Sequence, residues 1–405
     1  MSDFQAKLQH LSAEQVEALY SEYISGEKIA HLLERYAIDV APSSLIKAFP
    51  PLPCAALRCP YCKTSLFERR KSRTASSCHD NMAFCKTCDH RHYFPGPTKW
   101  RRVCACQPCL AARQQARLEL QAQQRQRIRE HWSLARRQPI PLRSLSITRK
   151  LQLLALLEVR MDKQHERLLP AEHPTGEEHV SPSKAMDASL LQALQEDLIL
   201  LVDPDSPPAS FSNDPTPKAW RDKVYWVVNV SLHGHQRAGL MPLRRVLLDL
   251  LGVGPRPEWR EQLSEAITAL SIEHVCACIA SRCAAHGLPF EPREKATQVA
   301  AQLLGMLPVA SALSLVDDAV HSALTYIARS HVTPHHASST IPANMLAAAE
   351  RAVREQWQFG PCSYASSAAR SAYSRVLFDV LLRQDDHGLR RRIAEYIVEL
   401  PRRGT

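Results

Sequence analysis

Apolar residues recur at intervals of three and four along most of the chain, with polar residues between them. This periodicity predicts helices, because positions three and four apart lie on one face of an α-helix. From Ser146 to Val159 the apolar positions are dense enough for a firmly buried helix. Beyond residue 242 the same spacing continues to the C-terminus, interrupted at glycine and proline residues. The pattern therefore predicts a mainly α protein.

Two short segments in the middle of the chain depart from helical spacing. Residues 199–202 form a continuous apolar run, and residues 224–228 are rich in valine and aromatic residues, which favour β-strands. A predicted helix over residues 186–198 precedes the first run, and a Pro/Ser-rich loop at residues 204–217 separates the two runs. This order of helix, strand, loop and strand is compatible with a winged-helix domain.

The first 51 residues predict three short helices. Ser12 begins a capping-box pattern, Gly26 separates the first helix from the second, and Pro42 opens the third. Three short helices with a glycine turn between the first two resemble a helix-turn-helix unit. In such a unit the third helix would present to DNA the side chains of Ser43, Ser44 and Lys47. A plain three-helix docking module fits the same pattern, so both interpretations stay open.

The length of the chain indicates several domains, and the distribution of charge marks one segment as strongly basic. The 405 residues are too many for one ordinary core, and a hydrophobic content of 45% excludes a wholly disordered chain. Residues 51–150 hold 21 Lys and Arg against 5 Asp and Glu, a net +16, whereas the whole chain is +10. A positive potential localised in this way favours a polyanion-binding surface, although a solvated basic face has the same composition.

The chain carries no recognisable targeting segment, and its cysteines are clustered. Residues Met1–His10 are polar, and no run of 18 apolar residues occurs, so we expect no signal peptide, no membrane span and a cytoplasmic protein. In a reducing compartment, clustered thiols bind metals more often than they form disulfides. Nine of the 13 cysteines lie between Cys54 and Cys109, so we expect a metal site there.

Two C-x2-C pairs within this cluster have the spacing of metal ligands. Cys59-Pro60-Tyr61-Cys62 and Cys85-Lys86-Thr87-Cys88 are separated by 22 residues. Each pair can supply two thiolates from one tight turn, and Zn²⁺ takes four such ligands in a tetrahedron. The double pair resembles the zinc-ribbon superfamily. That resemblance implies a small β-ribbon stabilised by one structural Zn²⁺ on Cys59, Cys62, Cys85 and Cys88.

Three further thiols indicate room for a second Zn²⁺. Cys104, Cys106 and Cys109 fall within six residues and need a fourth ligand. The available candidates are Cys54, Cys78, His79, His90 and His92. We expect Cys78 to be this ligand because it lies in the insert between the two C-x2-C pairs. The sequence leaves the pairing of ligands between the two sites open.

Basic residues surround the cysteines and alternate with aromatic residues. Cations beside aromatic side chains suit phosphate contact together with base stacking. We expect the run 69–73 to be a solvent-exposed loop of the ribbon, and Phe67 and Phe94 to pack its core. The predicted phosphate-contacting residues are Arg69, Arg70, Lys71, Arg73, Arg91, Lys99, Arg101 and Arg102.

These patterns together predict a multidomain chain of five segments. They are a helix-turn-helix-like unit at residues 1–51, a zinc ribbon at 52–110, a basic connecting helix at 111–138, a winged-helix domain at 139–232 and a helical bundle at 233–405. The bundle is the expected region of self-association or of binding to a protein partner.

We find no catalytic constellation in the sequence. Cys59-Pro60-Tyr61-Cys62 also occurs in glutaredoxin-like oxidoreductases, but its strand-to-helix context is missing here. Cys276 and Cys283, seven residues apart on one predicted helix, are expected in a core. The sequence thus predicts a non-enzymatic, zinc-dependent nucleic-acid-binding protein, with DNA as the expected polymer, that is a regulator or a subunit of a mobile-element or defence complex. The alternatives are a scaffold whose ribbon docks an acidic protein, and a toxin or nuclease subunit with an unfamiliar site.

Overall fold

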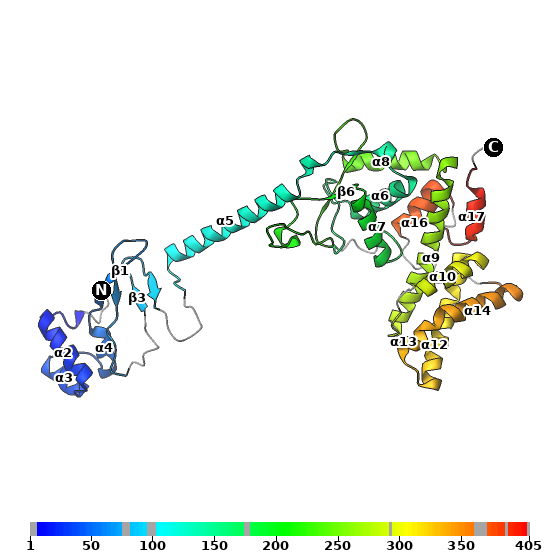
Figure 1. The fold of residues 1–405 in the computed structure, drawn as a ribbon. Helices are drawn as coiled ribbons and strands as arrows, with labels where there is room; N and C mark the ends of the chain where they lie inside the picture. The colour runs from blue at the N-terminus through cyan, green and yellow to red at the C-terminus, as the bar shows by residue number, and fades with distance from the viewer. Residues whose placement is uncertain are drawn as a thin grey trace. The chain divides into compact units, whose positions relative to one another are not determined.

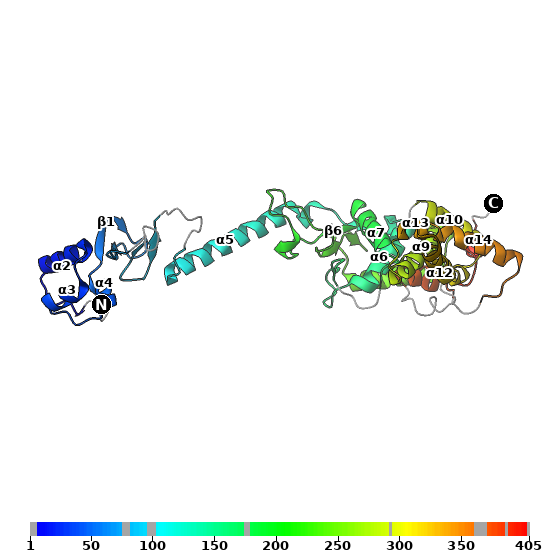
Figure 2. The same cartoon turned by 90° about the horizontal axis from the view of Figure 1, so that it is seen from below.

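The computed structural model describes residues 6–74, 82–94, 103–173, 179–290, 294–359, 371–384 and 388–402. It is mainly helical, as predicted, with a small antiparallel sheet near the N-terminus (Figures 1 and 2). The chain forms two compact units, Met1–Gln123 and Gln124–Thr405, which are described separately.

Unit 1 begins with the predicted group of short helices. Gln15 N–H donates to Ser12 Oγ at 3.2 Å and Ser12 N–H donates to Gln15 Oε1 at 2.8 Å, so the capping box forms. Gly26, at φ 102°, ends the first helix. Leu19 and Leu32 are fully buried among the helices. The elements are α2 (Ala13–Ser25), α3 (Ile29–Arg35), η1 (Pro42–Ser44) and α4 (Leu45–Ala48).

A four-stranded antiparallel ribbon follows these helices in unit 1. Its strands are β1 (Leu52–Arg58), β2 (Ser65–Glu68), β3 (Met82–Phe84) and β4 (Arg91–Tyr93), in the order β1-β2-β3-β4. Leu66 and Ala83 are buried against Cys59 and Cys85. This small core has few apolar residues, so a ribbon of this size depends on additional cross-links such as metal ions.

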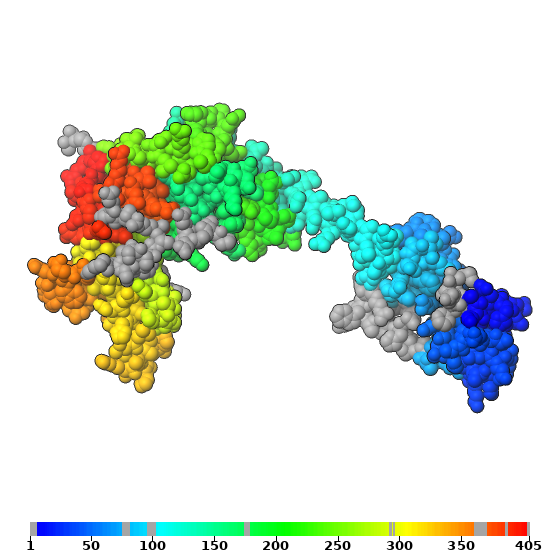
Figure 3. Space-filling model, turned by 180° about the vertical axis from the view of Figure 1, so that it is seen from behind, coloured from blue at the N-terminus to red at the C-terminus, as the bar shows by residue number. Residues whose placement is uncertain are grey.

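Helix α5 (Gln107–His131) follows the ribbon and joins the two units along the chain. Residues 110–123 are all exposed, and Ile128 is the helix's buried residue (Figure 3). The segment is rich in Ala, Gln, Arg and Leu, which favour helix without help from packing.

In unit 2 the helices α6 (Ile147–Arg160) and α7 (Lys184–Glu196) precede the strands β6 (Leu200–Val202) and β7 (Trp226–Val228), in the predicted order. The two helices are each capped by a serine, Ser146 and Ser183. The short sheets pair β5 (Ile140–Pro141) in parallel with β8 (Val230–Ser231), and β6 antiparallel to β7. The 3-10 turns are η2 (Leu134–Arg136), η3 (Leu142–Ser144), η4 (Pro208–Ser210) and η5 (Pro257–Trp259).

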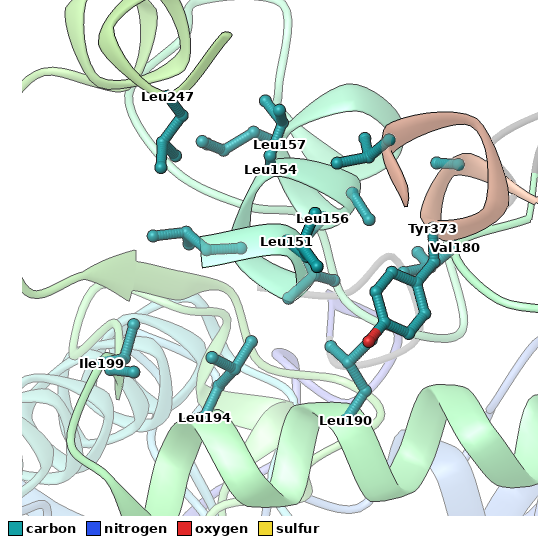
Figure 4. Close-up of a cluster of buried hydrophobic side chains, with 14 of the residues drawn as sticks. Leu151, Leu154, Leu156, Leu157, Val180, Leu190, Leu194, Ile199, Leu247 and Tyr373 are labelled. Atoms are coloured by element: carbon teal, nitrogen blue, oxygen red, sulfur yellow. The ribbon is translucent and has the colours of Figure 1, made fainter. Parts of the chain in front are cut away.

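The main hydrophobic core of unit 2 forms around α6. Leu151 and Leu154 are fully buried, because α6 carries apolar residues on nearly every face. Figure 4 shows this helix meeting Leu190 and Leu194 of α7, Leu247 of α8 (Leu240–Gly252) and Tyr373.

A second core lies among the C-terminal helices. Cys276, Cys278 and Cys283 are buried in it, which confirms the prediction that cysteines of this segment pack in a core. The second core forms among α9 (Arg260–Ala285), α10 (Glu294–Met306), α11 (Val309–Ser314), α12 (Val316–Ser330), α13 (Pro334–Ser339) and α14 (Ile341–Arg354). The last elements, α16 (Ala372–Ser374), the π-helix η6 (Arg375–Leu381) and α17 (Ile393–Glu399), place their buried hydrophobic residues in the first core.

Within the described part of the chain, one helical stretch, Pro257–Ala285, is long and apolar enough to cross a membrane by length and composition. Half of its most apolar window is buried inside the protein. Leu263 and Ile267 of this stretch belong to the first core, and Val275 and Ile279 belong to the second. Packing in these cores accounts for its apolar composition.

Candidate metal centres

The two C-x2-C pairs form matching turns in the ribbon. In the first turn Cys59 N–H donates to Thr64 O, and in the second turn Cys85 N–H donates to His90 O, both at 2.8 Å. The Cys59 carbonyl accepts from Lys63 N–H at 3.0 Å, and the Cys85 carbonyl accepts from Asp89 N–H at 3.1 Å. Lys63 and Asp89 both adopt the left-handed backbone conformation, at φ 59° and 56°. This reversal directly after each pair brings its two thiols to one side of the turn.

The four thiols of these turns form the predicted first cluster. The sulfur atoms of Cys59, Cys62, Cys85 and Cys88 all lie within 4.8 Å of one another. Cys59 Sγ and Cys88 Sγ are 3.5 Å apart. A tetrahedral Zn²⁺ with Zn–S bonds of about 2.3 Å places its sulfurs roughly 3.8 Å apart. The donor set and its spacing therefore fit one Zn²⁺.

The thiols of the first cluster differ in acidity before a metal binds. Burial raises the pKa of Cys85, but hydrogen bonds from the Thr64 hydroxyl and from backbone N–H groups outweigh it and lower the pKa to about 6. Burial, followed by hydrogen bonds with its neighbouring thiols, raises the pKa of Cys88. One thiolate thus forms readily, whereas Zn²⁺ must displace the protons of others, and its affinity decreases as the pH falls.

A second cluster lies next to the first, and His90 completes it. His90 Nδ1 is 3.2 Å from Cys109 Sγ and 3.8 Å from Cys106 Sγ. With Cys104 these four ligand atoms also lie within 4.8 Å of one another. Three thiolates and one imidazole are a common structural zinc set, so this cluster fits a second Zn²⁺.

The structure thus places His90 in the position for which Cys78 was predicted, and Cys78 lies outside the described residues. His90 follows Cys88 by two residues, so the turn that supplies two ligands to the first cluster supplies one to the second. Another candidate, Cys54, belongs to neither cluster: its thiol donates to Glu68 Oε1 at 3.2 Å. Burial lowers the pKa of His90, with a smaller contribution from His92, which favours the neutral imidazole that binds metal.

The second cluster lies at the N-terminus of helix α5. Cys106 precedes the helix, and Leu110 N–H donates to its carbonyl at 3.0 Å. Arg113 donates to the carbonyls of Cys104 and, at 3.2 Å, Cys109. The partial positive charge at a helix N-terminus stabilises thiolates there. Metal binding at this cluster therefore anchors the first turn of an otherwise exposed helix.

Tyr61 links the two clusters, a role that the sequence did not indicate. It lies between Cys59 and Cys62, yet its hydroxyl donates to Cys109 Sγ at 3.3 Å. Its ring meets the His90 ring edge-on, with centroids 5.5 Å apart. The hydrogen bond to Cys109 is the largest cause raising the pKa of Tyr61 to about 12. Such contacts orient metal ligands and couple the two sites.

Arg70 differs from the expectation of an exposed, phosphate-contacting side chain. Its side chain is only 3% exposed and forms an ion pair with Glu17 of α2. Its guanidinium lies 4.6 Å from the Tyr20 ring centre and donates to Pro50 O at 3.3 Å. Arg70 therefore attaches the ribbon to the N-terminal helices, and we call this set of contacts the Arg70 latch.

Arg73 has a similar structural role. It lies 4.4 Å from the Tyr23 ring centre and donates to Glu27 O at 3.1 Å. Unlike Arg70, however, Arg73 is exposed, as are Arg69, Lys71 and Arg91. In the N-terminal helices Ser43 and Lys47 are exposed and Ser44 is half-buried. The predicted residues Lys99, Arg101 and Arg102 lie outside the described residues.

The fold and the two clusters define a mainly α protein of several parts, with a Cys/His metal-binding ribbon in its N-terminal unit. Comparisons with protein-family models, curated proteins and solved structures found no match to this chain. The assignment of zinc therefore depends on the ligand types and their spacing.

The second cluster makes a direct prediction about metal content. Replacing His90 with alanine is expected to remove one of two Zn²⁺ ions, because three thiolates alone leave the tetrahedron incomplete. His90→Cys should retain both ions, since cysteine supplies a fourth soft ligand. Metal analysis of the purified full-length protein measures this. His92→Ala is the matched control; loss of zinc from this control with full retention in His90→Ala would contradict the assignment.

Proposed function

We propose that this is a zinc-dependent, non-enzymatic nucleic-acid-binding protein of the cytoplasm, with DNA as the expected polymer. The supporting observation is the excess of exposed cations around the metal clusters. Among the described ribbon residues, the exposed cations are Arg58, Lys63, Arg69, Lys71, Arg73, Lys86 and Arg91. Asp89 is the exposed carboxylate among the described ribbon residues 52–94, because Glu68 is half-buried and accepts from Cys54.

This excess matters because the clusters fix the positions of the cations. Lys63 and Lys86 belong to the two cysteine turns, and Arg91 N–H donates to Cys104 Sγ at 3.1 Å. A preorganised positive surface attracts phosphate strongly, since binding releases the counterions condensed on the polymer. Zinc would then act on binding indirectly, by holding the cationic surface in shape.

The remaining parts of the chain fit supporting roles in this proposal. The N-terminal helices, as a helix-turn-helix unit, would add the exposed Ser43 and Lys47 to the contact. Unit 2 would recruit a protein partner or a second copy, so that the protein acts as a regulator or as a subunit of a larger complex.

Affinity measured over a salt series tests the proposal. The triple variant Arg69→Gln, Lys71→Gln, Arg91→Gln is expected to reduce the slope of log K against log salt by roughly 0.9 for each lost phosphate contact on duplex DNA, or about 2 to 3 in all. The matched control removes the same charge from unit 2 through Arg329→Gln, Arg351→Gln and Arg354→Gln, which are exposed there.

A wild-type slope near zero would overturn the proposal. An unchanged slope in the triple variant would show that these three side chains do not contact the phosphates. If the triple variant instead loses only an acidic protein partner, with no nucleic acid bound by the wild type, the ribbon serves as a protein-docking scaffold.

A further inference from the structure

One face of the ribbon sheet carries three aromatic rings. Phe67 of β2 lies opposite Phe84 of β3, and Met82 lies opposite Tyr93 of β4. Side chains alternate between faces along a strand, and directly paired residues share a face. Phe67, Phe84 and Tyr93 therefore lie on the same side of the sheet, which we call the aromatic face.

The ribbon core lies on the opposite side of the sheet. Leu66 and Ala83, which alternate with the aromatic positions, are buried beside the first metal cluster. Phe94 packs against this core, as predicted. Phe67 was also expected in the core, but it lies on the aromatic face and is half-buried, as are Phe84 and Tyr93. These three rings are thus available to something outside the ribbon.

Cations flank the rings on the aromatic face. The Arg69 guanidinium is 5.9 Å from the Phe84 ring centre, and Lys86 Nζ is 3.8 Å from the Phe67 ring centre. Arg91 lies opposite Phe84 in the strand register and is exposed. Glu68 belongs to the other face, where it accepts from Cys54. The face therefore combines aromatic surface with positive charge.

We propose that the aromatic face binds a single-stranded nucleic acid through its unpaired bases. Bases would stack on Phe67, Phe84 and Tyr93, while the flanking cations contact the phosphates. This inference rests on the proposed function and names the class of its ligand. Aromatic rings beside cations bind single strands with little sequence preference, because every base has a π-face.

The spacing of the rings favours unpaired bases over a duplex. The ring centres of Phe67 and Phe84 are 6.5 Å apart. Successive bases of a duplex strand rise by only about 3.4 Å and stack on each other. Two bases can therefore lie on both rings only when they are separated from one another, which a single strand permits.

Fluorescence anisotropy with the full-length, zinc-loaded protein tests the inference. The probes are a labelled oligonucleotide of 20 or so residues and the duplex of the same sequence, since a single OB-type platform covers about 4–16 nucleotides. The double variant Phe67→Leu, Phe84→Leu keeps apolar bulk but removes the π-faces. It is expected to weaken single-strand binding about tenfold or more and to leave duplex affinity unchanged.

Tyr326→Leu, at a partly exposed tyrosine of α12 in unit 2, is the matched control and should bind like the wild type. Equal weakening of single-strand and duplex binding in the double variant, or no weakening of either, overturns the inference while leaving nucleic-acid binding intact. A wild type that binds neither probe overturns the proposed function as well.

A second variant keeps the test decisive if the double leucine variant fails to retain zinc. Arg69→Gln with Lys86→Gln changes only exposed side chains. It should reduce the salt slope for the single strand by roughly 0.7 per lost phosphate contact, about 1.4 in all. An unchanged slope for the single strand would overturn the inference.

Discussion

Replacing Cys85 with serine is expected to remove Zn²⁺ from the first cluster and to unfold the ribbon. Among the described ribbon residues the buried core consists of Cys59, Leu66, Ala83 and Cys85, which is too little apolar surface to hold the fold alone. Structural zinc contributes roughly 10–16 kcal/mol of apparent binding free energy in small zinc-folded peptides. Loss of one thiolate therefore removes more free energy than the ribbon can replace. Metal analysis and limited proteolysis of the full-length protein measure the result.

Cys54→Ser is the matched control for this prediction. Cys54 lies on β1 near the cluster but bonds to Glu68 rather than to the metal ligands. Burial and Glu68 raise its pKa to about 11, so it stays a neutral thiol. The control should retain both Zn²⁺ ions and resist protease. A Cys85→Ser protein that keeps full zinc content and protease resistance would contradict the structural role of the first cluster.

Within the Arg70 latch, Glu17→Ala is expected to destabilise unit 1 more than Arg70→Met does. Arg70 has a side chain 3% exposed, whereas that of Glu17 is 60% exposed. Removing Glu17 leaves a buried guanidinium without its counter-ion, whereas removing Arg70 leaves a carboxylate that water can solvate. Breaking a fully buried pair costs about 3–5 kcal/mol, so the cost here should be about 2 kcal/mol after allowance for the exposure of Glu17.

Hydrogen exchange of the α2 amides in the full-length protein measures this asymmetry, with Glu14→Ala on the same helix as an exposed control. The hydrogen bond from Arg70 is the largest cause lowering the pKa of Glu17. The latch therefore stabilises the fold fully above the ordinary glutamate pKa, and this contribution is lost as the pH falls through the lowered value in the folded protein. An equal or greater cost for Arg70→Met, or a latch strengthened by acid, would contradict the assignment.

The metal ligands show how far local spacing can predict a site. In a C-x2-C pair the ligands are so close in sequence that one turn determines their geometry, and the first cluster was correctly predicted. Cys104, Cys106 and Cys109 were also correctly placed together. Their fourth ligand was not, because a distant residue can be brought there only by the path of the intervening strands. His90 lies directly after the second turn, two residues beyond Cys88, and belongs to the second cluster.

The hydrophobic pattern by itself determined the helices and the core positions of Cys276 and Cys283, because the α-helical period repeats within a few residues. It could not tell which cations of the run 69–73 remain exposed, since Arg70 meets Glu17 across 53 residues. Nor could it separate Phe67 from Phe94, because the face of each ring depends on strand register. Local periodicity is an intrinsic property of a segment, whereas contacts between residues distant in sequence form only when the chain packs. Packing alone therefore decided which residues stabilise the fold and which remain exposed for binding.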